Sequence, residues 1–287
     1  MYAITGITGK VGGALAHTLL AHGQRVRAVV RDAGKGKEWA ARGCQVSVAE
    51  MDDAKGLTAA FQGATAAFIL PPPVFDPTPG YPEMRRVIDA LSEALNTARP
   101  GRVLSLSTVG AQATQDNLLS QLSLVEQQLS SLSLPVTFLR PAWYLDNAAW
   151  DVATARDSGV IHSFLSPLDR AIPMVSTQDV GRVAAELIQQ EAPARNIAEL
   201  EGEQRVSPND LASAFTRALG KPVRAQVVPR DTWESLFRSQ GMQHPEPRIR
   251  MLDGFNQGWL DFAAPAQTIK GLVGVNEAIE ALSRPKT

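Results

Sequence analysis

Three glycines near the N-terminus have the spacing that binds a pyrophosphate. Gly6, Gly9 and Gly12 follow a short β-prone segment and lead into residues 14–21, which have helical spacing. Such glycines let backbone N–H groups and a helix N-terminus approach a phosphate closely, where the aligned peptide dipoles favour negative charge. The strand–turn–helix context predicts that this segment binds a dinucleotide rather than forming an ordinary turn.

A cation stands where the second strand is expected to end. Residues 25–31 have the pattern of that strand, and Arg31 lies nineteen residues after Gly12. In NAD-specific sites an acidic residue at this position binds the ribose 2′-hydroxyl. A guanidinium instead donates two charge-assisted hydrogen bonds to a 2′-phosphate, so NADP is favoured over NAD. Asp32 keeps NAD open as the alternative if the strand ends one residue later.

Alternating strands and helices must hold these residues in place. We expect strands at residues 25–31, 45–49, 66–70, 102–107 and 136–139, and helices at 38–42, 54–61, 82–98 and 118–132. Repeated βα units of this length predict an α/β fold, a Rossmann-type doubly wound parallel sheet. Ligands of such sheets lie outside the carboxyl ends of the strands. The loops after the strands, including residues 31–37, are therefore the expected site.

The second half of the chain has a different pattern and is expected to form a smaller α+β region. Ser176 and Ser207 each precede a helical segment and are followed three positions later by aspartate, as in a capping box. We expect helices at 180–190, 211–219, 231–240 and 269–282, and a strand at 223–228. The predicted division is a dinucleotide-binding domain, 1–150, with residues 174–192 packed back on it, and a substrate or partner region, 151–287, that closes over the nicotinamide.

The composition indicates a soluble cytoplasmic enzyme. A chain of 287 residues can bury a full core, and its net charge of −1 argues against a nucleic acid or a membrane surface as a direct partner. The single cysteine, Cys44, excludes an intramolecular disulfide and fits a reducing compartment. No signal peptide is evident, and no apolar run reaches the roughly 20 residues that span a bilayer.

Five segments carry a family resemblance: residues 4–12, 26–31, 139–147, 172–180 and 219–223. Together they resemble the NmrA-like branch of the atypical short-chain dehydrogenase/reductases, and in particular their NADPH-dependent quinone reductases. The most distinctive of them is the Arg140-Pro141-x-Trp143-Tyr144 element. Because the segments are spread along most of the chain, the resemblance covers more than the glycine motif that many dinucleotide-binding proteins share.

The resemblance implies which residues bind the cofactor. It places Thr8, Gly9, Lys10 and Val11 along the pyrophosphate, between Gly6 and Gly12. It gives the 2′-phosphate to Arg31 and places Asp52 beside the adenine. At the nicotinamide end, Leu70 and Pro71 would border the ribose, Ser107 and Thr108 would lie near the ring, and the far wall would be Pro141, Trp143 and Tyr144. No metal site is expected.

One feature separates this chain from the short-chain dehydrogenases that reduce ketones. Those enzymes pair a tyrosine, the general acid, with a lysine four residues later that lowers its pKa. The helix predicted at 118–132 contains neither residue. Of the three tyrosines, Tyr2, Tyr81 and Tyr144, only Tyr144 lies in a matched site motif. Ordinary ketone reduction is therefore disfavoured.

Two functions fit a site without this proton relay. The first is NADPH-dependent reduction of a small-molecule hydride acceptor such as a quinone, whose oxygens become phenolate without a strong acid. Hydride transfer would then depend on holding the two rings face to face, with Tyr144 donating to a carbonyl and Ser107 orienting the nicotinamide. The second is a catalytically weak NADP-binding redox sensor that acts through a protein partner. A homodimer is compatible with either function.

Aromatic residues of the C-terminal region are further candidates for the site. Residues 233–237 and 251–259 could wall an aromatic pocket together with Phe75 and Tyr81, could face a partner, or could simply form core. A nucleoside-sugar epimerase or an isoflavone-type reductase is a weaker third option on the same fold, because fold alone does not decide function.

Overall fold

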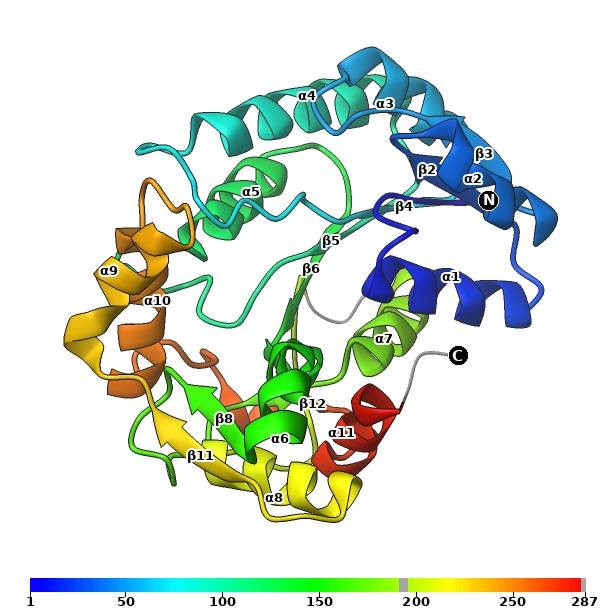
Figure 1. Ribbon diagram of the computed structural model, residues 1–287. Coiled ribbons are helices and arrows are strands. Elements are labelled where there is room, and N and C mark those ends of the chain that lie inside the picture. The colour runs from blue at the N-terminus through cyan, green and yellow to red at the C-terminus, as the bar shows by residue number, and fades with distance from the viewer. Residues whose placement is uncertain (191–195, 285–287) are drawn as a thin grey trace.

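Eight parallel strands form one central sheet in residues 1–190 and 196–284, which a computed structural model describes. Their order is β12-β10-β6-β5-β4-β1-β2-β3 (Figure 1). The strands are β1 Tyr2–Ile4, β2 Val26–Val30, β3 Gln45–Val48, β4 Ala66–Ile69, β5 Val103–Leu106, β6 Val136–Pro141, β10 Ile197–Glu201 and β12 Ile269–Lys270. Each neighbouring pair is parallel, which confirms the predicted Rossmann-type doubly wound α/β fold.

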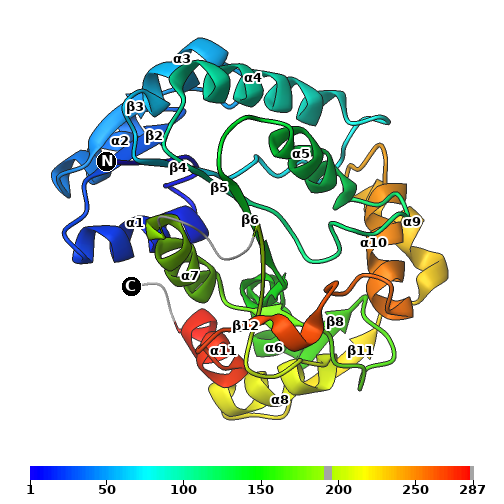
Figure 2. The same ribbon diagram turned by 180° about the vertical axis from the view of Figure 1, so that it is seen from behind.

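Helices cover both faces of the sheet (Figures 1 and 2). One face carries α1 Lys10–Ala21, α2 Ala33–Ala41 and α7 Thr177–Gln189, and the other carries α3 Ala54–Phe61, α4 Pro82–Ala98 and α5 Ser120–Ser130. An apolar cluster fills the space beneath each set of helices. On the first face α1 and α7 touch directly, because a Cβ on Gly181 would lie only 2.4 Å from the Cβ of Ala14.

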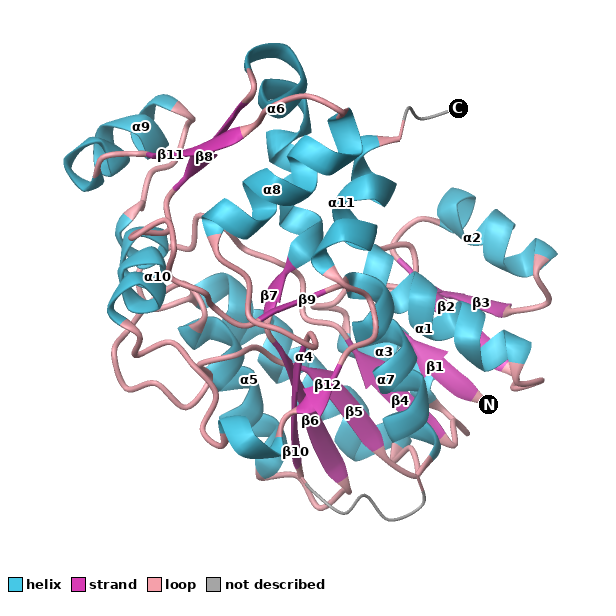
Figure 3. Cartoon of the chain, turned by 90° about the horizontal axis from the view of Figure 1, so that it is seen from below, coloured by secondary structure: helices cyan, strands magenta, loops and turns pink. Residues whose placement is uncertain are grey.

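Most of the second half of the chain lies beyond the carboxyl ends of the central strands (Figure 3). Its elements are β7 Trp143–Tyr144, the 3-10 helix η1 Leu145–Asp151, α6 Val152–Ser158, β8 Val160–Ser163, β9 Met174–Val175, α8 Pro208–Leu219, β11 Arg224–Val227, η2 Arg230–Thr232, α9 Trp233–Ser239, α10 Glu246–Gln257, η3 Pro265–Gln267 and α11 Val275–Ser283. This region also adds β10 and β12 to the central sheet, so the sheet extends past the predicted boundary at residue 150. Residues 191 and 192 of the segment predicted to pack back lie outside the described residues.

Both predicted helix caps are present. The Ser176 side chain accepts a hydrogen bond from the Asp179 N–H at the start of α7. Ser207 and Asp210 form a complete capping box at the start of α8, with Pro208 at the first helical position. The Asp179 carboxylate does not complete a capping box at α7. Its Oδ2 instead accepts hydrogen bonds from the N–H groups of Leu272 and Val273 at 3.0 and 2.9 Å. It thereby fixes the chain between β12 and α11.

Several predicted boundaries were wrong, each for a local reason. Helix α2 begins at Ala33 rather than at residue 38, because Oδ1 of Asp32 accepts the Gly34 N–H at 2.6 Å and caps it. Residues 161–163 belong to β8, for which no strand was predicted. The predicted closing helix is divided into β12 and α11, and α10 and β10 have no counterpart in the prediction. Short strands such as β10 and β12 pair with residues far away in the chain, so local patterns identify them poorly.

Neither a membrane span nor a metal cluster is found in the described part of the chain. No helix there is both long and apolar enough to cross a bilayer. No group of three or more His, Cys, Asp or Glu side chains is arranged to hold a metal ion in residues 1–190 and 196–284.

Candidate functional site

The glycine segment forms a tight loop between β1 and α1. Gly6 has φ +63°, a conformation that other residues rarely adopt, and a Cβ on Gly12 would lie 2.3 Å from the Gly6 carbonyl oxygen. Gly9 is the N-cap of α1 and, because glycine has no side chain, it offers no side-chain acceptor to the first N–H groups of the helix. The loop therefore approaches the helix N-terminus closely and keeps that end suited to an anion.

A residue absent from the sequence-based site list holds this loop against the next strand of the sheet. The Thr5 hydroxyl donates to the Phe68 carbonyl oxygen at 3.1 Å and accepts from the Leu70 N–H at 2.8 Å. It thus ties the ends of β1 and β4 together and brings the predicted nicotinamide-ribose residue Leu70 next to Gly6. In the sequence, the position of Thr5 directly before Gly6 could have indicated this role.

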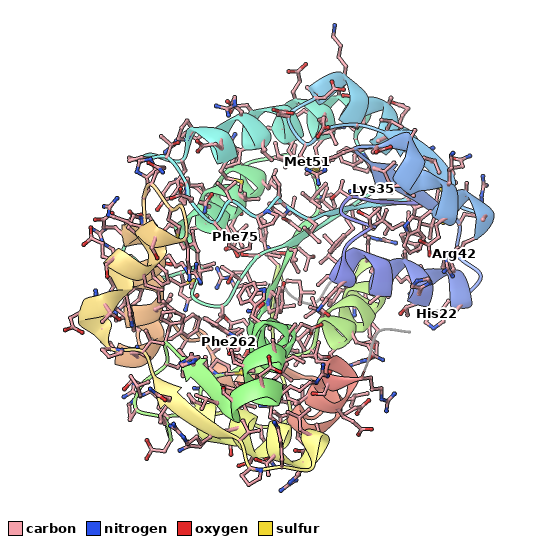
Figure 4. All side chains as sticks on the ribbon, in the orientation of Figure 1. His22, Lys35, Arg42, Met51, Phe75 and Phe262 are labelled. Carbon is pink, nitrogen blue, oxygen red and sulfur yellow. The ribbon has the colours of Figure 1, made fainter. Side chains whose placement is uncertain are left out.

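Two neighbouring cavities lie beside the glycine loop and share Thr8 and Lys35 as lining residues. The larger, of about 500 Å³, lies between α1 and α2 and includes His17 and Trp39. The smaller, of about 210 Å³, is lined by Val30, Arg31, Asp32 and Glu50 in addition to the shared pair. Lys35 lies next to the β1–α1 loop (Figure 4). Because α2 begins at Ala33, Lys35 projects from a helix rather than from the predicted loop.

The charged side chains at the smaller cavity differ in whether they already bind another group of the protein. Arg31 and Lys35 are exposed, and neither takes part in an ion pair within the described residues. Asp32 uses one carboxylate oxygen to cap α2. Two uncommitted cations beside a small polar cavity suit a phosphate group, and the capping role reduces what Asp32 can offer to a ribose hydroxyl.

Lys10 and the segment after β7 are joined by a carboxylate that the sequence reasoning missed. Asp146 Oδ1 lies 3.0 Å from Lys10 Nζ and accepts from the Thr177 hydroxyl at 2.8 Å, while Oδ2 accepts from the Thr177 N–H at 2.8 Å. Burial alone would raise the pKa of Asp146, but the hydrogen bonds from Thr177 and Lys10 hold it below its usual value. Asp146 therefore connects α1, η1 and α7 around the glycine loop.

Ser107 lies at the end of β5 above a buried ion-pair network. Its hydroxyl donates to Glu126 on α5 at 2.5 Å, and Glu126 accepts two hydrogen bonds from Arg140 at 2.8 and 2.6 Å. Arg140 also lies 3.5 Å from Glu199 on β10. Because its proton is donated to Glu126, Ser107 can offer only its lone pairs to a ligand in this arrangement. Glu126, Arg140 and Glu199 were not among the predicted site residues.

The other predicted cofactor residues lie on the expected loops. Leu70 and Pro71 follow β4, and both are at least half-buried. The Thr108 hydroxyl is buried and donates to the Val109 carbonyl oxygen at 3.1 Å. Asp52 is exposed on the loop between β3 and α3. Their contacts with a cofactor stay predictions.

Tyr144 and Trp143 form the short strand β7, directly after β6. The Trp143 ring meets the ring of Phe255 on α10 edge-on, with centroids 5.2 Å apart. Tyr144 is partly buried, and burial together with the nearby Asp146 carboxylate raises the pKa of its phenol. Tyr144 therefore keeps its proton and can act as a hydrogen-bond donor at neutral pH.

Helices α9 and α10 are tied to the loops that follow β4 and β5 (Figures 1 and 2). Asp76 accepts from the N–H groups of Gln243 and His244, both at 2.7 Å, and the Leu118 N–H donates to the Pro247 carbonyl oxygen at 2.9 Å. The Tyr81 hydroxyl donates to Asp116 at 2.6 Å, which links the two loops to each other. The C-terminal region thus covers the loops where the nicotinamide is predicted.

Asp151, at the end of η1, is a partly buried carboxyl group whose ionisation is expected to make the stability of the protein depend on pH. Burial raises the pKa of Asp151 to about 6, and the N–H of His162 only partly opposes the rise. A raised carboxyl pKa means that the folded state binds the proton more tightly, so stability falls as pH rises from about 4 to about 6. We expect Asp151→Asn to be about 1–3 kcal/mol more stable than wild type at pH 7, with no difference below about pH 4.

Urea unfolding of both proteins between pH 4 and pH 7 measures this difference. The exposed Asp157→Asn on α6 is the matched control and should change stability little at any pH. A gap between Asp151→Asn and wild type that stays constant across the pH range would contradict ionisation of Asp151 as the cause.

Comparison with known proteins identifies the family. Residues 2–257 match the NmrA-like family, so the chain belongs to that family and the sequence-based resemblance is confirmed. The chain is 25% identical over 275 residues to the NAD(P)H azoreductase of Xenophilus azovorans, covering 95% of this chain and 90% of that protein. It is 25% identical over 244 residues to quinone oxidoreductase 2 of Escherichia coli, covering 84% and 82%. The structure of a Citrobacter triphenylmethane reductase complexed with NADP(H) superposes with a TM-score of 0.81 at 22% identity, covering 98% and 99%, and shares the fold.

Proposed function

We propose that the protein is an NADPH-dependent reductase of quinones or similar hydride acceptors. The observation that carries the proposal is the pair of uncommitted cations, Arg31 and Lys35, that line a small cavity next to Thr8. Its NmrA-like relatives support the same reading, since two of them are an NAD(P)H azoreductase and a quinone oxidoreductase. NADP is favoured over NAD because Asp32 is engaged in capping α2.

The residues present fit such a cofactor. The glycine loop leaves no room for a Cβ at Gly12, and the first N–H groups of α1 have no side-chain cap, which suits a pyrophosphate. Arg31 and Lys35 would hold the 2′-phosphate, and Leu70, Ser107 and Trp143 lie on the loops where the nicotinamide end would lie. When bound, the reduced nicotinamide supplies a hydride.

The absence of a tyrosine–lysine general-acid pair on α5 indicates which class of acceptor the site could reduce. Helix α5 carries Glu126, engaged with Arg140, and no tyrosine–lysine pair. A ketone would need a strong general acid, whereas a reduced quinone is an acceptable phenolate near neutral pH. Tyr144 would hold a proton toward one acceptor oxygen, and Ser107 would act as an acceptor that orients the nicotinamide carboxamide.

Tyr144→Phe tests the role of the phenol. If Tyr144 donates to the acceptor, we expect kcat to fall about tenfold to 100-fold, because one donor to a developing oxyanion is removed. Because the pKa of Tyr144 is raised, wild-type activity should not decline through loss of this proton between pH 6 and pH 9. Steady-state kinetics with a quinone measure both effects. An unchanged kcat would assign Tyr144 to packing.

The proposed function is tested by measuring NADPH oxidation by the purified protein with a panel of benzoquinones and naphthoquinones, with NADH in parallel. Turnover with NADPH and at least one quinone is the expected result. Tight NADPH binding without oxidation across the panel would overturn the reductase proposal and favour a redox sensor that acts through a protein partner.

A further inference from the structure

Arg248 on α10 is a partly buried cation that has no counter-charge among the described residues. Its guanidinium lies 4.3 Å from the centre of the Phe237 ring, and Nη1 donates to the Met242 sulfur at 3.8 Å. Burial alone acts on this group and lowers its pKa. None of the ion pairs formed by the described residues includes Arg248, whereas the neighbouring Arg250 on the same helix pairs with Asp116.

This environment is unfavourable for a cation that has no further role. Removing a guanidinium from water without an acidic partner costs stability, and a thioether is a weak acceptor. Stacking on Phe237 offsets part of this cost through the ring's negative face. The other guanidinium N–H groups donate to no acceptor among the described residues, so they can donate bidentately to an anionic ligand.

The position of Arg248 on α10 relates it to the predicted nicotinamide site. Phe255 lies seven residues later, so the two side chains share one stripe of the helix, about 10 Å apart along its axis. Phe255 contacts Trp143, the predicted far wall of the nicotinamide site. Trp143, Phe237, Met242 and Phe255 all belong to one continuous apolar cluster.

The loop that follows β4 is hydrogen-bonded to the turn before α10, the helix that carries Arg248. The turn before α10 is held by Asp76, whose carboxylate accepts from the N–H groups of Gln243 and His244. Asp76 follows Phe75, which is 60% exposed on the loop that begins with Leu70 and Pro71 (Figure 4). The loop that carries the exposed Phe75 ring is therefore hydrogen-bonded to the turn that leads into the helix of Arg248.

We propose that Arg248 selects acceptors that carry a carboxylate or sulfonate on an arm that extends from the aromatic ring. This proposal rests on the proposed reductase function and narrows its substrate class. Arg248 would bind the anion as a specificity residue and take no part in hydride transfer. A cationic acceptor of similar size would be rejected by the same charge.

The test compares two acceptors that differ only in this charge: a 1,4-naphthoquinone with a carboxyalkyl arm, and its methyl ester. Arg248→Met keeps the length of the side chain but removes the charge, and Arg248→Lys restores the charge. Arg250→Met is the matched control on the same helix, because Arg250 is exposed and paired. NADPH oxidation gives kcat and KM for each acceptor, and a cationic triphenylmethane dye serves as a third acceptor.

We expect Arg248→Met to raise KM for the carboxylate at least tenfold, to leave kcat and the ester kinetics within about twofold, and to increase turnover of the cationic dye. Arg248→Lys should recover part of the lost affinity. Arg248→Met should also unfold at the same temperature as wild type or higher, since an unpaired cation is removed. Equal changes for acid and ester, or no change for either, would overturn the proposal.

Failure of the reductase function can be separated from failure of this proposal. If the wild-type protein oxidises NADPH with none of these acceptors, the proposed function fails. Calorimetric titration of the NADPH-loaded protein with the carboxylate quinone then decides about Arg248. Binding that weakens at least tenfold in Arg248→Met supports the anion site, and equal or absent binding in both proteins overturns it.

Discussion

Replacing Arg31 and Lys35 together with alanine is expected to weaken NADPH binding about 100-fold or more, while NADH binding changes less than about threefold. Each cation would make charge-assisted hydrogen bonds to the 2′-phosphate, and such bonds contribute about 1.5–3 kcal/mol apiece. Both side chains line the small cavity beside Thr8 and have no ion pair to lose within the described residues. The loss should therefore fall on the phosphate alone.

Fluorescence titration with NADPH and with NADH measures the two dissociation constants. Lys37→Ala is the matched control, since Lys37 projects from the same helix but lines neither cavity. The NADPH affinity of the wild type should also fall with added salt more steeply than that of the double variant. Equal losses of affinity for NADPH and NADH would show that the two cations do not bind the 2′-phosphate.

Replacing Arg140 with methionine is expected to destabilise the protein by about 3–5 kcal/mol, because two buried carboxylates lose their counter-charge. The Arg140 side chain is 6% exposed, and its partners Glu126 and Glu199 are 12% and 8% exposed. Because the three residues connect α5, β6 and β10, the loss of their ion pairs should weaken the packing of these elements. The unfolding temperature should fall by about 10 °C.

Urea unfolding of Arg140→Met and wild type measures this loss. Arg42→Met is the control, because Arg42 pairs with Glu38 on the surface of α2, where an ion pair contributes about 1 kcal/mol or less. If Arg140→Met loses no more stability than Arg42→Met, the network does not hold the sheet together. A second readout is NADPH turnover, which should fall as well if Glu126 positions Ser107.

The features that could be read from the sequence depend on residues close together in the chain. Gly6 and Gly12 specify a tight turn because only glycine fits their backbone conformation and close approach. Ser207 and Asp210 specify a helix start because the cap is formed within four residues. The absence of a tyrosine–lysine pair in residues 118–132 was equally visible, since that relay has a fixed spacing on one helix.

The parts that could not be predicted depend on partners far apart in the chain. Asp146 meets Lys10 across 136 positions, and Asp76 meets His244 across 168. Nothing in the residues near Asp146 indicates that its carboxylate will face α1, because that geometry is set by packing β7 against β9. The start of α2 was missed although its cap is local: the Gly34 N–H donates to Asp32, so the helix begins at Ala33 and Lys35 lies on it at the wall of the smaller cavity.

The sequence by itself determined the parallel α/β fold, the tight glycine turn after the first strand and the absence of a tyrosine–lysine relay, because βα alternation, glycine sterics and spacings along one helix are local properties. Only the tertiary structure decided which charges are engaged and which are left over. Asp32, Lys10 and Glu126 each find a partner, whereas Arg31, Lys35 and Arg248 find no counter-charge within the described residues. Pairing is a property of three-dimensional distance, so the charges without a partner could be recognised only once the chain was folded.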